Sequence, residues 1–199
     1  MNRMRRDAEL LRVVRLNEAI KAVVEASRQV YTIALNAMFA ARRSLVRVPG
    51  FTRVTEELRV FSQRLDRSVA EVGGSLGQMV RVGAEQAKQA RRGRHFERAD
   101  AGCRRQGASP ALLAGALATQ QARQAGHARR LGALREAMAG ALGRALRLCG
   151  IGEQLAVLAK VEAQAGGANA ELESVAVRLQ QAIAEILVRL NGARALLDH

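Results

Sequence analysis

Residues 11–44 read LRVVRLNEAIKAVVEASRQVYTIALNAMFAARRS, and this stretch decides the fold class. Apolar or small residues recur in it at alternating intervals of three and four residues: Val13, Leu16, Ile20, Val23, Ser27, Val30, Ala34, Ala37, Ala41 and Ser44. This spacing is typical of a coiled-coil seam along one side of a long helix. Pro49 and Gly50 follow the seam, and they predict a turn at 45–50.

A second seam begins directly after this turn and predicts a helix that runs back along the first. Its members are Phe51, Val54, Leu58, Phe61, Leu65, Ser68, Val72, Ser75, Met79 and Val82. Because the connection is short, the two helices are expected to form an antiparallel hairpin. Gly73 and Gly74 lie inside the second arm and mark a candidate bend, since glycine in a helix costs about 1 kcal/mol relative to alanine.

The second half of the chain predicts another hairpin. Ser109 and Pro110 are a favourable start for a third helix, which is expected to end near residue 165. Its seam is weaker and rich in alanine: Leu131, Leu134, Met138, Ala141, Ala145, Leu148, Leu155 and Ala159. Gly166 and Gly167 predict a turn at 165–168. A last helix over 169–197 carries the seam Leu172, Val175, Leu179, Ala182, Ile186, Leu190, Ala193 and Leu197.

The sequence therefore predicts an all-α fold in which two long antiparallel hairpins, 1–90 and 110–199, form a four-helix bundle or coiled coil. Both turns are expected at the same end. Glu57-Leu58 and Arg64-Leu65 recur as Glu171-Leu172 and Arg178-Leu179. This echo indicates either a duplicated hairpin or the ordinary likeness of two Ala/Leu helices. Residues 91–109, basic and without a seam, are predicted to be a mobile linker and not a dedicated nucleic-acid site.

Composition gives two readings of the charge. The net charge is +14, and 29 of the 32 basic residues are arginine. A polyanion partner would explain this, but so would a GC-rich genome that encodes solvated helix faces with arginine, and we favour the second because the arginines are spread among acids. With two cysteines, no apolar leader and no long apolar run, the sequence predicts a cytoplasmic protein without a membrane span.

The first turn and its flanks, residues 29–59, resemble the hairpin tip of the cytoplasmic signalling domain of methyl-accepting chemotaxis receptors. The alignment has no gap, and the matching positions are Ala34-Leu35-Asn36-Ala37, Arg43, Gly50-Phe51, Val54, Glu57 and Arg59. In that family the tip is a long antiparallel hairpin that dimerises into a four-helix bundle. It binds a chemotaxis histidine kinase (CheA) and a coupling adaptor (CheW).

The resemblance implies a degenerate, short receptor-tip protein that acts by protein–protein contact at this end, in signalling or as a scaffold. The partner-binding residues that it implies are Leu35, Asn36, Arg43, Gly50, Phe51, Val54, Glu57 and Arg59, and Val46 is added from the turn between them, where the sequence departs from the family pattern. Asn36 has an equally good structural role, because a buried Asn fixes the register of a coiled coil. Val46 belongs to an apolar stretch at an expected turn, where exposed apolar side chains indicate a binding surface or burial against a second protomer.

Two other functions stay open on the sequence. One is a basic helical bundle that binds nucleic acid through residues 91–105, and the other is a purely structural oligomer, for example a homodimer. The three histidines have no cysteine or acid at ligand spacing, and no nucleophile–base pattern or phosphate loop is present. The sequence therefore predicts no enzyme activity, no catalytic or metal site and no cofactor.

Overall fold

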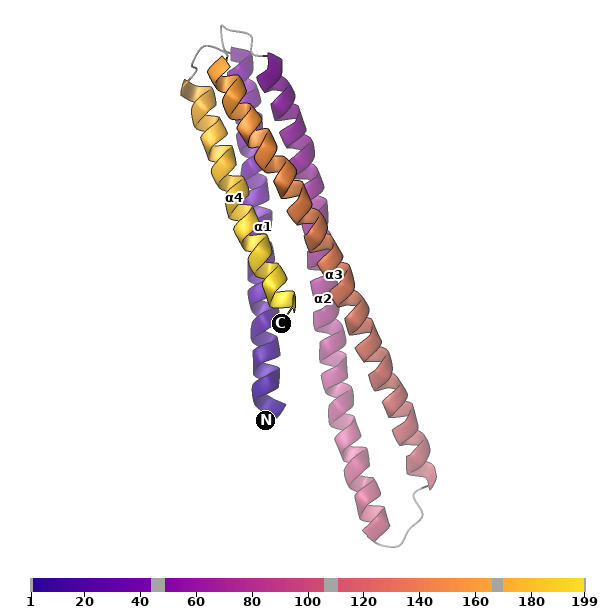
Figure 1. The fold of residues 1–199 in the computed structure, drawn as a ribbon. Coiled ribbons are helices and arrows are strands. Elements are labelled where there is room, and N and C mark those ends of the chain that lie inside the picture. Colours follow the sequence, from indigo (N-terminus) through magenta and orange to yellow (C-terminus); the bar gives the residue numbers. More distant parts are fainter. Residues whose placement is uncertain (1, 44–48, 106–110, 166–169, 199) are drawn as a thin grey trace. The chain divides into compact units, whose positions relative to one another are not determined.

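A computed structural model describes residues 2–43, 49–105, 111–165 and 170–198, and all of them lie in four helices (Figure 1). The helices are α1 (Asn2–Arg43), α2 (Pro49–Arg105), α3 (Ala111–Ala165) and α4 (Ala170–Asp198). The predicted all-α class with long antiparallel helices is confirmed. The two predicted turns fall largely on 44–48 and 166–169, outside the described residues, as do Ser109 and Pro110.

The chain forms two compact units that are built from different lengths of the same helices. Unit 1 contains residues 1–73 and 138–199, and unit 2 contains residues 74–137. One division falls between Gly73 and Gly74, the pair that the sequence marks as a candidate bend, although α2 is continuous through it. The predicted hairpins, 1–90 and 110–199, therefore do not coincide with the compact units.

Unit 1 is a four-helix bundle in which each helix runs antiparallel to its neighbours along the chain (Figure 1). α1 packs against α4. Side chains of α1 and α2 meet at Ser27 and Asp66, and side chains of α2 and α3 meet at Glu71 and Arg144. The last turn of α1, the first of α2, the last of α3 and the first of α4 lie together at one end, which we call the turn end.

The buried face of each helix in unit 1 is wider than the predicted seam. On α2 the positions Thr55, Ser62, Val69 and Leu76, seven residues apart, are buried beside the predicted ones, and on α4 the same holds for Ala176 and Ile183. A helix in a bundle contacts two neighbours at once, so it buries about three positions in seven instead of two. The burial pattern thus fits a bundle better than a two-stranded coiled coil.

A small polar layer joins α1 to α2 inside the bundle. The Ser27 hydroxyl donates to Oδ1 of Asp66 at 2.6 Å, and the Ser62 hydroxyl donates to the backbone oxygen of Ser27 at 3.2 Å. Both serines are fully buried, and Asp66 lies at the surface. Because a register slip would leave these buried hydroxyls without partners, the layer fixes the height at which the two helices pair.

The α3 seam buries Met138, Ala141, Ala145 and Ala159 as predicted, but it differs from the sequence prediction by one residue between 148 and 156. Leu148 and Leu155, predicted to be buried, are half-buried, and the smaller Cys149, Gly152 and Ala156 lie in the core instead. The cause is the ring of Phe61 from α2. A Cβ on residue 152 would lie 2.8 Å from Cζ of Phe61, so only glycine leaves room for the ring.

In unit 2, α2 continues as a helix through residues 91–105, where the sequence analysis expected a linker. The seam also continues, but with members that the sequence analysis did not count: Gln86, Gln89, Gly93 and Asp100. From α3, Gln120 lies over Gly93 and its Nε2 donates to the backbone oxygen of Gln89 at 3.1 Å. In unit 2 the two helices therefore meet at a polar contact beside Gly93, whereas Leu76 and Val82 are buried nearer to residue 74.

Candidate protein interaction surface

The two hairpins of unit 1 bury equivalent positions. Adding 114 to eight consecutive buried positions of α2 gives eight buried positions of α4; they start with Leu58 and Leu172 and end with Leu76 and Leu190. In the same way, adding 122 to positions 16, 20, 23, 27, 30, 34 and 37 of α1 gives buried positions 138, 142, 145, 149, 152, 156 and 159 of α3. The sequence similarity between α2 and α4 is thus accompanied by equivalent buried positions in both hairpins.

The same equivalence holds on the outer faces near the turn end. Phe39 on α1 corresponds to Val161 on α3, and their side chains are 52% and 54% exposed. Leu35 and Asn36 correspond to Val157 and Leu158; Leu35 is half-buried and the other three are exposed. We call these six residues the turn-end faces.

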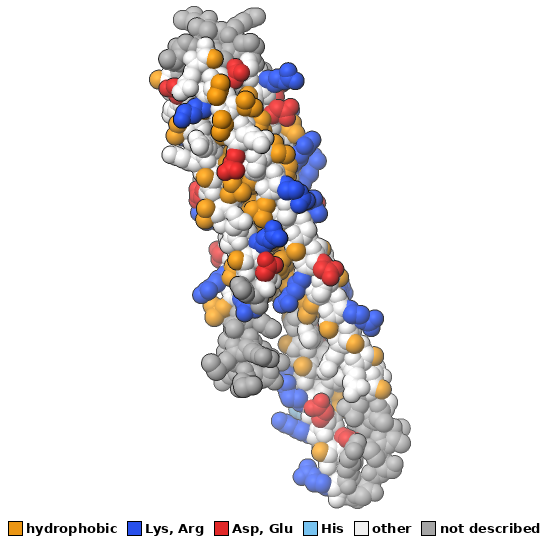
Figure 2. All heavy atoms as spheres, viewed as in Figure 1, with side chains coloured by type: hydrophobic (Ala, Val, Ile, Leu, Met, Phe, Trp, Pro, Cys, Tyr) orange, Lys and Arg blue, Asp and Glu red, His pale blue; other side chains and the backbone are white. Residues whose placement is uncertain are grey.

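Large apolar side chains on the outside of a bundle have no packing role in it, so paired apolar faces indicate contact with another molecule. Figure 2 shows hydrophobic side chains at the surface of unit 1 among Arg and Glu, over the α3 and α4 side of the bundle. Ile151 on α3 extends this apolar strip away from the turn end.

Some residues that the resemblance implies as partner contacts lie in the core. Phe51 and Val54 are buried at the start of α2, where they stabilise the bundle. Gly50 is half-buried, and the Glu162 carboxylate of α3 lies where a side chain on residue 50 would be. No acid occurs in the first turn of α2, so Glu162 supplies the negative charge that favours a helix N-terminus.

The other implied residues lie on different sides of the bundle. Arg59 is seven residues from Asp66, so it lies on the side of α2 that adjoins α1. Leu35 is half-buried on α1, and the antiparallel register set by Ser27 and Asp66 places it at about the same height as Arg59. Asn36 is exposed on α1 next to Leu35, and Glu57 is exposed on α2.

Two implied residues cannot be placed in this way. Val46 lies outside the described residues, and α1 ends at Arg43, whose side chain is also outside them. The residues that the sequence analysis missed are Phe39, Val157, Leu158 and Val161. Residue type alone does not separate an exposed Val or Phe from a core one. The signal that could have found them is the 122-residue offset between α1 and α3.

Among the titratable groups of the described residues, Cys149 is the one whose pKa is clearly shifted. It is fully buried in α3. Burial first, and the negative charge of Glu153 second, raise the pKa of its thiol to about 12. A neutral, enclosed thiol is a poor nucleophile, so Cys149 serves packing.

Within the described residues, no group of three or more His, Cys, Asp or Glu side chains is arranged to hold a metal ion. In the same part of the chain, no helix combines the length and hydrophobicity that crossing a bilayer requires. Comparison with known proteins adds no identification, since no protein-family model, curated protein or solved structure matches the chain.

Proposed function

We propose that this protein acts by protein–protein contact at the turn end of its bundle, as a degenerate and short form of the chemotaxis-receptor signalling hairpin. The observation that carries the proposal is the pair of equivalent turn-end faces, Leu35, Asn36 and Phe39 on α1 and Val157, Leu158 and Val161 on α3. Four of the six, Phe39, Val157, Leu158 and Val161, are apolar and exposed outside the core of the bundle. Their repetition on both hairpins supports a common use.

The resemblance of residues 29–59 supports the choice of partner. In the receptor family the corresponding end of a four-helix bundle contacts a chemotaxis histidine kinase and its coupling adaptor. Here one chain supplies both hairpins of such a bundle, and Leu35 and Asn36 belong both to the resemblance and to the turn-end faces. We therefore propose the kinase and the adaptor as partners, with a signalling or scaffolding role in the cytoplasm and without enzyme activity.

The test is co-purification of the native kinase and adaptor with the wild-type chain and two variants, Phe39→Glu and Val161→Glu. A charge in an apolar contact typically removes more than 2 kcal/mol of binding energy, which is roughly thirtyfold in affinity. Val188→Glu is the matched control, because Val188 is 72% exposed and lies in the second half of α4, away from the turn end. All three variants should melt within a few degrees of wild type, since each changes an exposed side chain.

Three outcomes contradict the proposal. The wild type could capture neither protein, or Phe39→Glu and Val161→Glu could bind as well as wild type. The third is that the two variants convert a homo-oligomer to monomer in light scattering while no kinase or adaptor is bound. That result would assign the turn-end faces to a structural oligomer.

A further inference from the structure

Unit 2 carries more than half of the net charge of the chain. Residues 74–137 contain 12 Lys and Arg and four Asp and Glu, a net charge of +8 out of the total of +14. Eleven of the 12 basic residues are arginine. The charge is therefore concentrated on one two-helix hairpin, in contrast to the even spread that the sequence analysis assumed.

Two hollows lie on one side of this hairpin, between α2 and α3, with volumes of about 450 and 560 Å3. Gln78 and Arg81 line the first, and Gln89 and Arg92 line the second. Each pair is eleven residues from the other, which is three helical turns, so both face the same side of α2. The two hollows thus present the same chemistry about 16 Å apart, at ~1.5 Å per residue.

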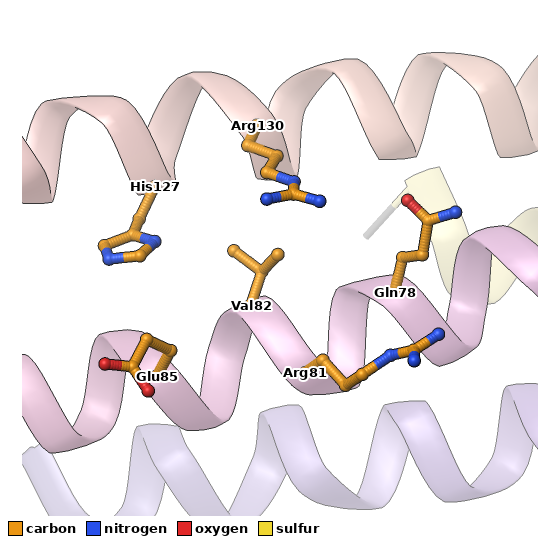
Figure 3. Close-up of a pocket in the computed structure, with 6 residues that line it drawn as sticks. All are labelled: Gln78, Arg81, Val82, Glu85, His127 and Arg130. Atoms are coloured by element: carbon orange, nitrogen blue, oxygen red, sulfur yellow. The ribbon is translucent and has the colours of Figure 1, made fainter.

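The α3 side of each hollow is also basic. Arg130 and His127 line the first, and Arg123, seven residues before Arg130, lines the second. Figure 3 shows His127 and Arg130 projecting from α3 toward α2, where Val82 faces them. Glu85 is the single acid among the lining residues, and its Oε1 accepts from Nε2 of Gln89 at 3.2 Å.

Four guanidinium groups, from Arg81, Arg92, Arg123 and Arg130, therefore form a track along one side of unit 2, which we call the arginine track. Among the described residues none of the four is paired with a carboxylate. Phe96, 39% exposed, lines the second hollow together with Arg92 and Arg123. Repeated cations beside an exposed aromatic ring are the features with which proteins hold single-stranded nucleic acid, by phosphate contacts and base stacking.

We propose that the arginine track of unit 2 binds single-stranded nucleic acid, with Arg81, Arg92, Arg123 and Arg130 at phosphates and Phe96 stacked on a base. This activity is separate from the contact proposed at the turn end. It departs from the sequence prediction that residues 91–109 are not a dedicated nucleic-acid site, because Arg92 and Phe96 belong to that segment. A linear polymer suits two like hollows on one line, and an unpaired base is needed to reach the Phe96 ring. An anionic membrane fits less well, because Val80 and Phe96 are the only large apolar side chains exposed among the described residues of unit 2.

The experiment measures fluorescence anisotropy of a labelled 15-nucleotide RNA of mixed sequence with the full chain, in 0.05 to 0.2 M NaCl. Four phosphate contacts give a slope of about −2.8 in log K against log salt, so Kd should rise about 50-fold over this range. Replacing the four track arginines together by glutamine should remove most of this salt dependence. Phe96→Ala should weaken binding at least fivefold and leave the slope unchanged.

A matched control separates the track from general charge attraction. Arg91, Arg94, Arg98 and Arg105 are exposed on another side of α2, and replacing these four by glutamine lowers the net charge equally. The control variant should keep at least half of the wild-type affinity. Equal losses in the two variants would overturn the proposal, and so would wild-type binding to vesicles with 30% phosphatidylserine but not to the RNA.

Circular dichroism of each variant should match wild type, because all the changed side chains are exposed or line open hollows. The turn-end variant Phe39→Glu should bind the RNA as wild type does. This result keeps the nucleic-acid proposal distinguishable from the proposed protein contact.

Discussion

The contact between Phe61 and Gly152 gives the sharpest test of the bundle's packing. In Gly152→Ala the new methyl carbon would lie 2.8 Å from Cζ and 2.9 Å from Cε2 of Phe61. The ring is 3% exposed, so it lies in the core of the bundle. Overpacking of this kind costs about 1–3 kcal/mol, whereas alanine gains about 1 kcal/mol over glycine in a helix. We expect a net destabilisation of up to about 2 kcal/mol.

Gly150→Ala is the matched control. It lies two residues away on the same helix, and nothing lies within 4 Å of a Cβ at that position. It should therefore stabilise the protein by about 1 kcal/mol. In thermal melts the two variants should differ by several degrees, at 2–4 °C per kcal/mol for a chain of this size. Phe61→Leu in the Gly152→Ala background should recover part of the difference. Equal stabilisation by both alanines would refute the close approach of α2 and α3.

Three further predictions concern single positions. Ser27→Ala should lower the free energy of unfolding by about 1 kcal/mol in urea titrations, because Asp66 and Ser27 lose a hydrogen bond of 2.6 Å; an unchanged midpoint would contradict the polar layer. In a Cys103→Ser background Cys149 should react slowly with iodoacetamide at pH 8 until the protein unfolds. The pKa of the Cys149 thiol is raised from 9.0 to about 12. The contribution of the neutral thiol to the free energy of unfolding is therefore full below pH 9 and is lost as the pH rises toward 12. Fast alkylation of the folded protein would exclude the burial of Cys149. Gly74→Ala should raise the melting temperature by 2–4 °C, since nothing lies within 4 Å of the added methyl group; a lower value would point to a bend that needs glycine.

The helical class and most core positions of unit 1 could be predicted because alternating steps of three and four mark one side of a helix. Ile20, Val23, Leu58 and Leu65 are buried as their seams require. The additional buried positions, such as Val69, could not be predicted from a seam. Their burial depends on whether a helix packs against one neighbouring helix or two.

Two other features depend on contacts that a single helix does not reveal. Hydrophobicity alone predicts that α3 buries Leu148 and Leu155. The bulky ring of Phe61 instead packs against the side of α3 that carries Gly152. The helix beyond residue 90 was missed because its seam contains Gln86, Gln89 and Asp100, whose polar side chains hide the spacing. Arginine, alanine and glutamate are good helix formers, so this segment needs no apolar stripe to be helical.

The candidate surface was predictable only in part. The resemblance pointed to the turn end, and it named Leu35 and Asn36 there. It also named Phe51 and Val54, which the bundle buries. A residue that matches the receptor hairpin can serve folding or partner binding, and only its burial in the structure distinguishes these two roles. Phe39 and Val161 emerged from exposure and from the equivalence of the two hairpins.

The contact at the turn end is the central claim, and hydrogen exchange tests it most directly. The chain would be exchanged alone and in the presence of the purified kinase and adaptor. Amides over residues 31–39 and 153–161 should exchange at least several-fold more slowly in the complex, whereas those over 180–195 on α4 should not change. Slowing confined to residues 74–137, or no slowing at saturating partner concentrations, would contradict the claim.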